Sequence, residues 1–252
     1  MPSNINWAAP MLSSFPNVPI PSVVPAEKGP TLRDLFKGRP TDEYLAGAAL
    51  FWEGDPAGQI FNIARGVLRV YKVLANGRRA IVGFIYPGDV LGVSCQRRYL
   101  FTAEAVTDVK VRRFSRGRFF SLINESPALT PQLFAFLCDE MSAAQNQMLL
   151  LGHKSAEERV ASFLLAVHHR SAIGNVIQLP MGRLDMADYL GLTIETVSRM
   201  MTSLTRRGLI AAAGRQTLTL RMPETLREIA GSDDRVDADS ESPSARRAVW
   251  PD

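Results

Sequence analysis

The chain is poor in cysteine, with two in 252 residues. Two cysteines cannot build a disulfide framework, which favours a reducing compartment, and we expect a cytoplasmic protein. No run of about 18 apolar residues is present, so we expect no membrane-spanning helix. The N-terminus also lacks the basic start and apolar block of a secretory signal.

Motifs of the common enzyme classes are missing as well. The chain holds no GxxxxGK[ST] phosphate loop, no GxSxG nucleophile elbow and no pair of histidines at metal-ligand spacing. The sequence therefore predicts neither an enzyme nor a metal site.

What the chain has is a basic segment near its C-terminal end. The net charge is only +4, but residues 193–221 hold five arginines and one acidic residue. Basic charge concentrated on one segment is typical of a nucleic-acid-binding module. With 46% hydrophobic residues, the chain is long enough for two modest cores, so we expect two domains.

Residues 183–209 have the pattern of two short helices joined by a tight turn. The first helix is expected over 185–190, and Gly191 follows where a left-handed backbone is needed. Thr193 is placed to cap the second helix. The residues expected to face inward are Ala187, Leu190, Val197, Met201 and Leu204.

The outward face of the second helix suits DNA. It would present Ile194, Glu195, Ser198, Arg199, Thr202 and Arg206. The planar fork of Arg199 matches the O6 and N7 acceptors of guanine, and Glu195 can accept from the amino group of cytosine. Two alternative interpretations do not involve DNA. The two helices could be an ordinary hairpin in a core, and Glu195 and Arg199 could form a solvated i, i+4 ion pair worth only tenths of a kcal/mol.

The run LPMGRLDMADYLGLTIETVSRMMTSLTRRGLI resembles the winged helix-turn-helix of the Crp/Fnr transcription regulators. Residues 195–199 match the E-x-x-S-R signature of the FNR and FixK branch. The resemblance extends through LLLGHKSAEERVASFLL and YPGDVLG upstream, over about residues 45–225. It implies base reading by Ile194, Glu195, Ser198 and Arg199, phosphate contacts by Thr193 and Thr196, and a TTGA-type inverted repeat in double-stranded DNA.

The segment before these helices has the residue pattern of short strands joined by turns. Glycines at 54, 66, 77 and 88 separate short β-branched and aromatic runs, which predicts a barrel or sandwich. The clearest hairpin is VLRVYKVL-ANG-RRAIVGFIY, in which Asn76-Gly77 favours a tight primed turn.

The expected fold is α+β. The resemblance implies a double-stranded β-roll (a jelly roll like that of cyclic-nucleotide-binding domains) over 44–124. A dimerisation helix over 127–152 and a winged helix-turn-helix over 153–229 would follow it. The arm 1–43 contains eight of the sixteen prolines and is expected to be irregular, apart from a helical turn at 32–37. The polar tail 230–252 is expected to be disordered.

Departures from the family pattern argue against a cofactor. Where the cyclic-nucleotide branch has a glutamate after the glycine and a later Arg-Ser pair, this chain has Val93 after Gly92 and the run Arg98-Tyr99-Leu100-Phe101. An iron–sulfur cluster needs four thiolates, but the arm has no cysteine and Arg112 stands at the family's central cysteine position.

Haem is equally unexpected in the β-roll. The three histidines, at 153, 168 and 169, all follow it, which leaves Cys95 as the one candidate ligand there. Arg97 and Arg98 would favour the thiolate of Cys95, so a redox role is a second possibility beside an inert thiol. We expect no cofactor.

Apolar or small residues spaced alternately three and four apart, the a/d pattern of a coiled coil, predict a homodimer that pairs along one helix. We call this stripe the seam. Its members are Phe134, Leu137, Met141, Ala144, Met148 and Leu151. The alternative is a helix that buries this stripe in its own domain. Pairing is favoured because a two-fold dimer presents two reading helices to an inverted repeat.

These features together predict a FixK-like, dimeric transcription activator. By resemblance it would bind DNA without a small ligand and recruit RNA polymerase to genes of low-oxygen respiration or nitrogen metabolism. Two alternatives stay open: a Crp-type regulator gated by a small molecule or by redox chemistry, and an effector-gated domain whose helical module binds proteins. Retention on an inverted-repeat duplex would separate DNA binding from protein binding.

Overall fold

The computed structural model describes residues 29–94 and 96–231. Its N-terminal part consists of two four-stranded antiparallel sheets, ordered β1-β8-β3-β6 and β2-β7-β4-β5. This double sheet is the predicted β-roll. The strands are β1 Thr41–Tyr44, β2 Ala49–Phe51, β3 Gln59–Arg65, β4 Leu68–Val73, β5 Arg79–Ile85, β6 Val90–Leu91, β7 Thr102–Ala105 and β8 Val109–Ser115.

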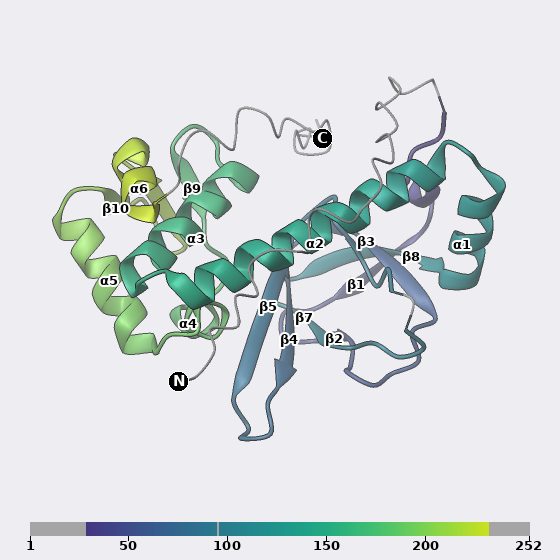
Figure 1. The fold of residues 1–252 in the computed structure, drawn as a ribbon, viewed down its shortest axis with the longest axis horizontal. Helices are drawn as coiled ribbons and strands as arrows, with labels where there is room; N and C mark the ends of the chain where they lie inside the picture. The colour runs from purple at the N-terminus through teal and green to yellow at the C-terminus, as the bar shows by residue number, and fades with distance from the viewer. Residues whose placement is uncertain (1–28, 95, 232–252) are drawn as a thin grey trace, which may run out of the picture.

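A long helix, α2, runs from the β-roll to a compact C-terminal domain (Figure 1). That domain contains four helices and the three-stranded sheet β10-β11-β9. Within the described part of the chain, no helix is long and apolar enough to span a bilayer. The remaining elements are η1 Asp34–Phe36, α1 Arg116–Glu125, α2 Leu129–His153, α3 Ala156–Ser171, β9 Val176–Gln178, α4 Arg183–Leu190, α5 Ile194–Arg206, β10 Ile210–Ala212, β11 Thr217–Leu220 and α6 Pro223–Ala230.

The β4–β5 hairpin forms as predicted, but its turn is of a different kind. Gly77 has a left-handed backbone (φ 77°), whereas Asn76 does not, since every described residue with positive φ is a glycine. The amide of Gly77 donates to the carbonyl of Leu74, and Leu74 N–H donates to the carbonyl of Arg78. This is a three-residue loop closed by glycine rather than the expected primed turn.

The N-terminal arm becomes ordered earlier than predicted. The helical turn expected at 32–37 is present as η1, and its Phe36 is buried between the rings of Phe114 and Phe119. Strand β1 then pairs with β8 from Thr41 onward, so the irregular arm does not extend to residue 43. Burial of one aromatic ring and pairing with an open sheet edge order this segment despite its prolines.

The other boundaries also shift. The long helix covers Leu129–His153 instead of 127–152, and the end of the stretch assigned to the β-roll is helix α1. The last helix, α6, continues to Ala230, past the predicted end at 229. The predictions for the arm before residue 29, for the tail beyond residue 231 and for Cys95 concern residues outside the described ones.

The start of α3 is a capping box. The Ser155 hydroxyl accepts from the backbone amide of Glu158 at 3.4 Å, and the Glu158 carboxylate accepts from the amide of Ser155 at 2.5 Å. These two bonds satisfy amides that a helix leaves unpaired at its first turn. They orient α3 directly after α2 ends.

Replacing Ser155 with alanine is expected to lower the free energy of unfolding by about 0.5–2 kcal/mol, because the cap is lost. Urea denaturation followed by circular dichroism measures this change. Ser155→Thr keeps the hydroxyl and should stay near the wild-type stability. A Ser155→Ala protein as stable as the Ser155→Thr protein would contradict the capping role.

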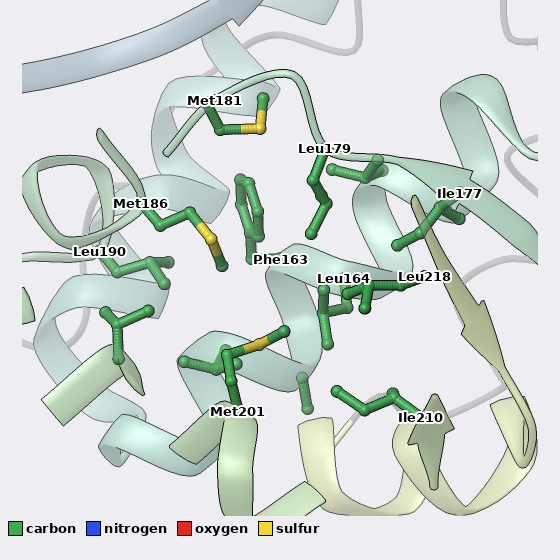
Figure 2. Packing of buried hydrophobic residues seen from close by; sticks show 14 of the residues in the cluster. Phe163, Leu164, Ile177, Leu179, Met181, Met186, Leu190, Met201, Ile210 and Leu218 are labelled. Carbon is green, nitrogen blue, oxygen red and sulfur yellow. The ribbon is translucent and has the colours of Figure 1, made fainter. Parts of the chain in front are cut away.

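The core of the C-terminal domain is formed by side chains from α3, α4, α5 and the small sheet. Figure 2 shows Phe163 and Leu164 of α3 among Met186, Leu190 and Met201, with Ile177, Ile210 and Leu218 from the strands. The same cluster continues into the β-roll through Val67, Tyr71, Ile81 and Phe84. The β-roll has an interior cluster of its own, which includes Phe61 and Leu68. Each domain therefore has a core, as expected, and the C-terminal core extends across the boundary between them.

Candidate nucleic-acid interface

The turn between α4 and α5 has the predicted construction. Gly191 ends α4 with a left-handed backbone (φ 62°), and the amide of Leu192 donates back to the carbonyl of Ala187. The Thr193 hydroxyl then accepts from the amide of Thr196 at 3.2 Å, which caps α5. One backbone reversal and one cap thus determine where the second helix begins.

One side of α5 is anchored in the core. Val197, Met201 and Leu204 are buried against α3 and α4, as the helical spacing predicted. Ala187 and Leu190 of α4 are buried in the same cluster. The two helices are therefore packed into one core.

The opposite side of α5 faces solvent. Of the six predicted DNA-contacting residues, five are exposed: Thr193, Ile194, Glu195, Ser198 and Arg199. Thr196 is half-buried, and its hydroxyl lies 3.1 Å from that of Thr193. The structure thus gathers the predicted residues at the exposed N-terminal end of one helix.

Hydrogen bonds at the start of α5 favour the ionised form of the Glu195 carboxylate. Its own backbone amide and the Thr193 side chain both hydrogen-bond to it, and they lower the pKa of Glu195. An ionised carboxylate at a helix N-terminus is also favoured by the helix dipole. Glu195 is accordingly available as an acceptor, as recognition of an amino group requires.

Beside this face lies an open hollow of about 380 Å³. It is lined by Arg183, Ser198, Met201, Thr202, Thr205 and Arg206. The guanidinium of Arg183 reaches the sulfur of Met186 at 3.2 Å, and burial lowers the pKa of Arg183. No described carboxylate forms an ion pair with it.

Sequence reasoning missed Arg183 as a member of this surface. It had placed Thr202 and Arg206 on the outward face, but Arg183 belongs to the preceding helix and shares no helical spacing with them. The available signal was a basic residue at the first position of α4. Two arginines and three hydroxyls around a hollow form a surface that suits a phosphate group.

The predicted seam lies uncovered along α2. All six of its residues are exposed, including Phe134 at 69% and Met148 at 65% of their surface. In this helix only Leu129 is buried within the chain. The alternative, a stripe buried in its own domain, is therefore not what the structure has.

The β-roll interior contains stacked aromatic rings near the position where the family's nucleotide-binding pair would lie. Tyr99 stacks on Phe51 with 3.8 Å between ring centroids, and Phe51 stacks on Phe61 at 5.7 Å. The Tyr99 hydroxyl donates to the carbonyl of Gln59 at 2.8 Å, and burial raises the pKa of Tyr99. Among residues 29–94 and 96–231, no three His, Cys, Asp or Glu side chains are grouped to hold a metal.

This fold and this surface match two known domain families. The cyclic nucleotide-binding domain matches residues 41–126, and the Crp-like helix-turn-helix domain matches residues 158–229. A β-roll, a long connecting helix and a helix-turn-helix with an exposed polar face define a DNA-binding transcription regulator.

Individual relatives agree. The transcriptional activatory protein AadR of Rhodopseudomonas palustris is 46% identical over 166 residues, which cover 64% of this chain and 70% of that protein. The nitrogen fixation regulation protein FixK of Bradyrhizobium diazoefficiens is 44% identical, covering 67% and 73%. The solved structure of FixK2 from Bradyrhizobium japonicum superposes with a TM-score of 0.74 at 36% identity, covering 76% of this chain and 96% of that one.

The chain belongs to the Crp/Fnr family and resembles its FixK members. Members of this family are dimeric DNA-binding transcription regulators. Its relatives are regulators and not enzymes.

Proposed function

We propose that two copies of the chain bind an inverted repeat of the TTGA type in double-stranded DNA. Ile194, Glu195, Ser198 and Arg199 read base edges in the major groove, and Thr193 and Thr196 contact the phosphate backbone. The observation that carries this proposal is the division of α5 into a buried side and an exposed polar N-terminal end. Such an end is the part of a recognition helix that reaches base edges.

The uncovered seam of α2 supports the dimer. Six exposed apolar or small residues, Phe134, Leu137, Met141, Ala144, Met148 and Leu151, follow one stripe of a 25-residue helix. Two such helices related by a two-fold axis would cover each other's stripe. The same axis relates the two α5 helices to the two halves of an inverted repeat.

Binding to matched duplexes tests the proposal. The purified dimer, with no added small molecule, is titrated with a labelled TTGA inverted repeat, a scrambled duplex of equal composition and a single half-site. We expect binding to the repeat to be about 10³-fold or more tighter than to the scrambled duplex at physiological salt. Equal affinity for the repeat and the scrambled duplex would refute sequence-specific reading.

We propose further that no cofactor or effector is required for this binding. The stacked rings of Phe51, Phe61 and Tyr99 support this view, because they pack in the β-roll interior and the Tyr99 ring lies beside Gly92. A Cβ on Gly92 would lie 3.5 Å from the Tyr99 ring. The titration above, made without ligand, also tests this point.

Activation is the proposed outcome of binding. AadR is named a transcriptional activatory protein, and the FixK relatives are named nitrogen fixation regulation proteins. By this relationship the chain would recruit RNA polymerase to genes of low-oxygen respiration or nitrogen metabolism. Run-off transcription from a promoter with the repeat should rise when the protein is added, and unchanged or falling transcription would contradict activation.

Arg183 is proposed as an additional phosphate contact. Replacing it with alanine should weaken binding to the repeat and to the scrambled duplex by similar factors. It should also reduce the slope of log K against log salt by about 2, because one ionic contact is lost in each of the two subunits. Arg118→Ala removes the same charge from the exposed face of α1 and serves as the control. A loss confined to the repeat would show instead that Arg183 acts in base recognition.

A further inference from the structure

A group of charged side chains joins the β-roll to the first helix of the DNA-reading unit. We call it the interdomain charge cluster: Arg69 and Tyr71 of β4, Arg79 of β5, Glu104 of β7, and Asp185 and Asp188 of α4. Strand β5 and helix α4 lie against each other at this boundary (Figure 1). No DNA-contacting residue belongs to the cluster.

Asp185 is its centre. Its carboxylate accepts from Arg69 Nη1 at 3.0 Å and from Arg79 Nη2 at 2.6 Å. Arg79 Nε donates in addition to Asp188 at 2.9 Å. Both bonds of Arg79 therefore cross from the β-roll to α4.

The β-roll side of the cluster is braced independently. Glu104 forms an ion pair with Arg69 and accepts from the hydroxyl of Tyr71 at 2.8 Å. The side chains of Arg69 and Glu104 are 17% and 13% exposed, and that of Asp185 is 10% exposed. Charges buried this deeply are costly unless their partners remain in place.

Apolar contacts beside the cluster supply attraction without direction. Phe84 of β5 lies 6.2 Å from Phe163 of α3 and 5.5 Å from Tyr189 of α4, measured between ring centroids. Apolar burial is non-directional, so these rings alone would tolerate several orientations. Paired buried charges penalise every orientation that separates them.

The position of α4 determines the position of α5. Ala187 and Leu190 pack in the same core as Val197 of α5, and the short turn at Gly191 leaves little freedom between the helices. On its other side, α4 is tied to the end of α2, because Arg159 donates to the carbonyls of both Leu190 and Leu151. A contact that holds α4 on the β-roll therefore orients α5 relative to the seam.

We infer that Arg79, together with Arg69, is a positioning residue for DNA recognition. By pairing with Asp185 and Asp188, it holds the helix-turn-helix in the orientation that a dimer needs to reach both halves of a repeat. This role rests on the proposed DNA binding. In this protein a permanent ion-pair contact between the domains performs the orienting step, and no bound ligand is needed for it.

Reversing the charge at Arg79 tests the inference, and a second reversal at Asp188 should restore the affinity for the repeat. Arg79→Glu places a carboxylate against Asp185 and Asp188, and Arg79→Gln is the milder variant should the reversal impair folding. If the docked fraction falls to about a tenth, affinity for the inverted repeat falls about tenfold. Asp188→Arg combined with Arg79→Glu restores a pair of opposite charges and should return affinity to within about threefold of wild type.

Arg78→Glu is the matched control, because Arg78 is the exposed neighbour of Arg79 in the same strand region. It makes the same charge change and should leave affinity within about threefold of wild type. Hydrogen exchange provides the second readout. Backbone amides of β5 and α4 should exchange faster in Arg79→Glu than in wild type and slow again in the double variant, while the dimer persists.

Three outcomes would overturn the inference. The first is faster hydrogen exchange in Arg79→Glu with unchanged affinity for the repeat. The second is a loss of affinity in Arg78→Glu as large as that in Arg79→Glu. The third is a folded double variant that regains neither affinity nor protection. A wild-type protein that fails to prefer the repeat would instead refute the proposed function, and the exchange measurement, which needs no DNA, would still report on the contact.

Discussion

Replacing Leu137 with aspartate is expected to convert the dimer into monomers and to abolish binding to the inverted repeat. In the single chain this side chain is 45% exposed on the uncovered stripe of α2. In a paired seam it would lie opposite its two-fold mate, so the variant would bury two unpaired carboxylates. Each uncompensated buried charge costs about 3–5 kcal/mol, which raises the dimer dissociation constant about a hundredfold or more.

Sedimentation at micromolar concentration measures the oligomeric state, and the labelled repeat measures binding. Ser142→Asp adds the same charge to an exposed position of α2 outside the seam and should leave both properties unchanged. An intact dimer of Leu137→Asp would refute the seam. Loss of repeat binding with a persisting dimer would place Leu137 in a different role.

Replacing Arg199 with alanine is expected to remove base recognition rather than general affinity. A bidentate contact between arginine and guanine is worth about 1–3 kcal/mol of discrimination, which corresponds to roughly five- to 150-fold in the dissociation constant. The side chain is exposed on α5 and forms no ion pair among the described residues, so its removal should not affect folding. Binding to the scrambled duplex should change far less than binding to the repeat.

Arg199→Lys separates charge from geometry. Lysine keeps the positive charge but lacks the planar fork, so binding to the scrambled duplex should be retained while the preference for the repeat falls. Equal losses on both duplexes in Arg199→Ala would identify Arg199 as a phosphate contact. Full preference in Arg199→Lys would show that a point charge suffices.

The helix-turn-helix could be predicted from sequence because local rules govern it. Gly191 was assigned to a left-handed turn and has φ 62°, and Thr193 was assigned to a cap and accepts from the amide of Thr196. The inward positions, among them Val197 and Leu204, are buried. Backbone sterics, capping and helical periodicity all act within a few residues, so they can be read from neighbours in the chain.

Predictions were wrong where distant segments decide the outcome. The Pro-rich arm becomes ordered before residue 43 because Phe36 packs between Phe114 and Phe119, which are distant from it in the chain. A primed turn was expected at Asn76-Gly77, but only Gly77 has a positive φ, and the β4–β5 pairing leaves a three-residue loop. Strand register and ring packing depend on partners distant in the chain, which a local sequence pattern cannot identify.

Among the proposed contacts, Arg183 was missed for a related reason. It lies in α4, yet it lines the same hollow as Thr202 and Arg206 of α5. Helical spacing groups residues within one helix only, so it cannot combine side chains from two helices that cross. The arrangement of those helices had to be known first.

The amino-acid sequence by itself determined the two helices and their turn, the polar end of α5, the apolar stripe of α2 and the family. Each depends on short-range periodicity or on single residues with special backbone or donor chemistry. Only the tertiary structure decided that the β-roll docks on α4 through Arg69, Arg79 and Asp185. Asp185 is 116 positions from Arg69 and 106 from Arg79 in the chain. Charges so far apart in sequence become partners only when the folded chain brings them together in a desolvated contact.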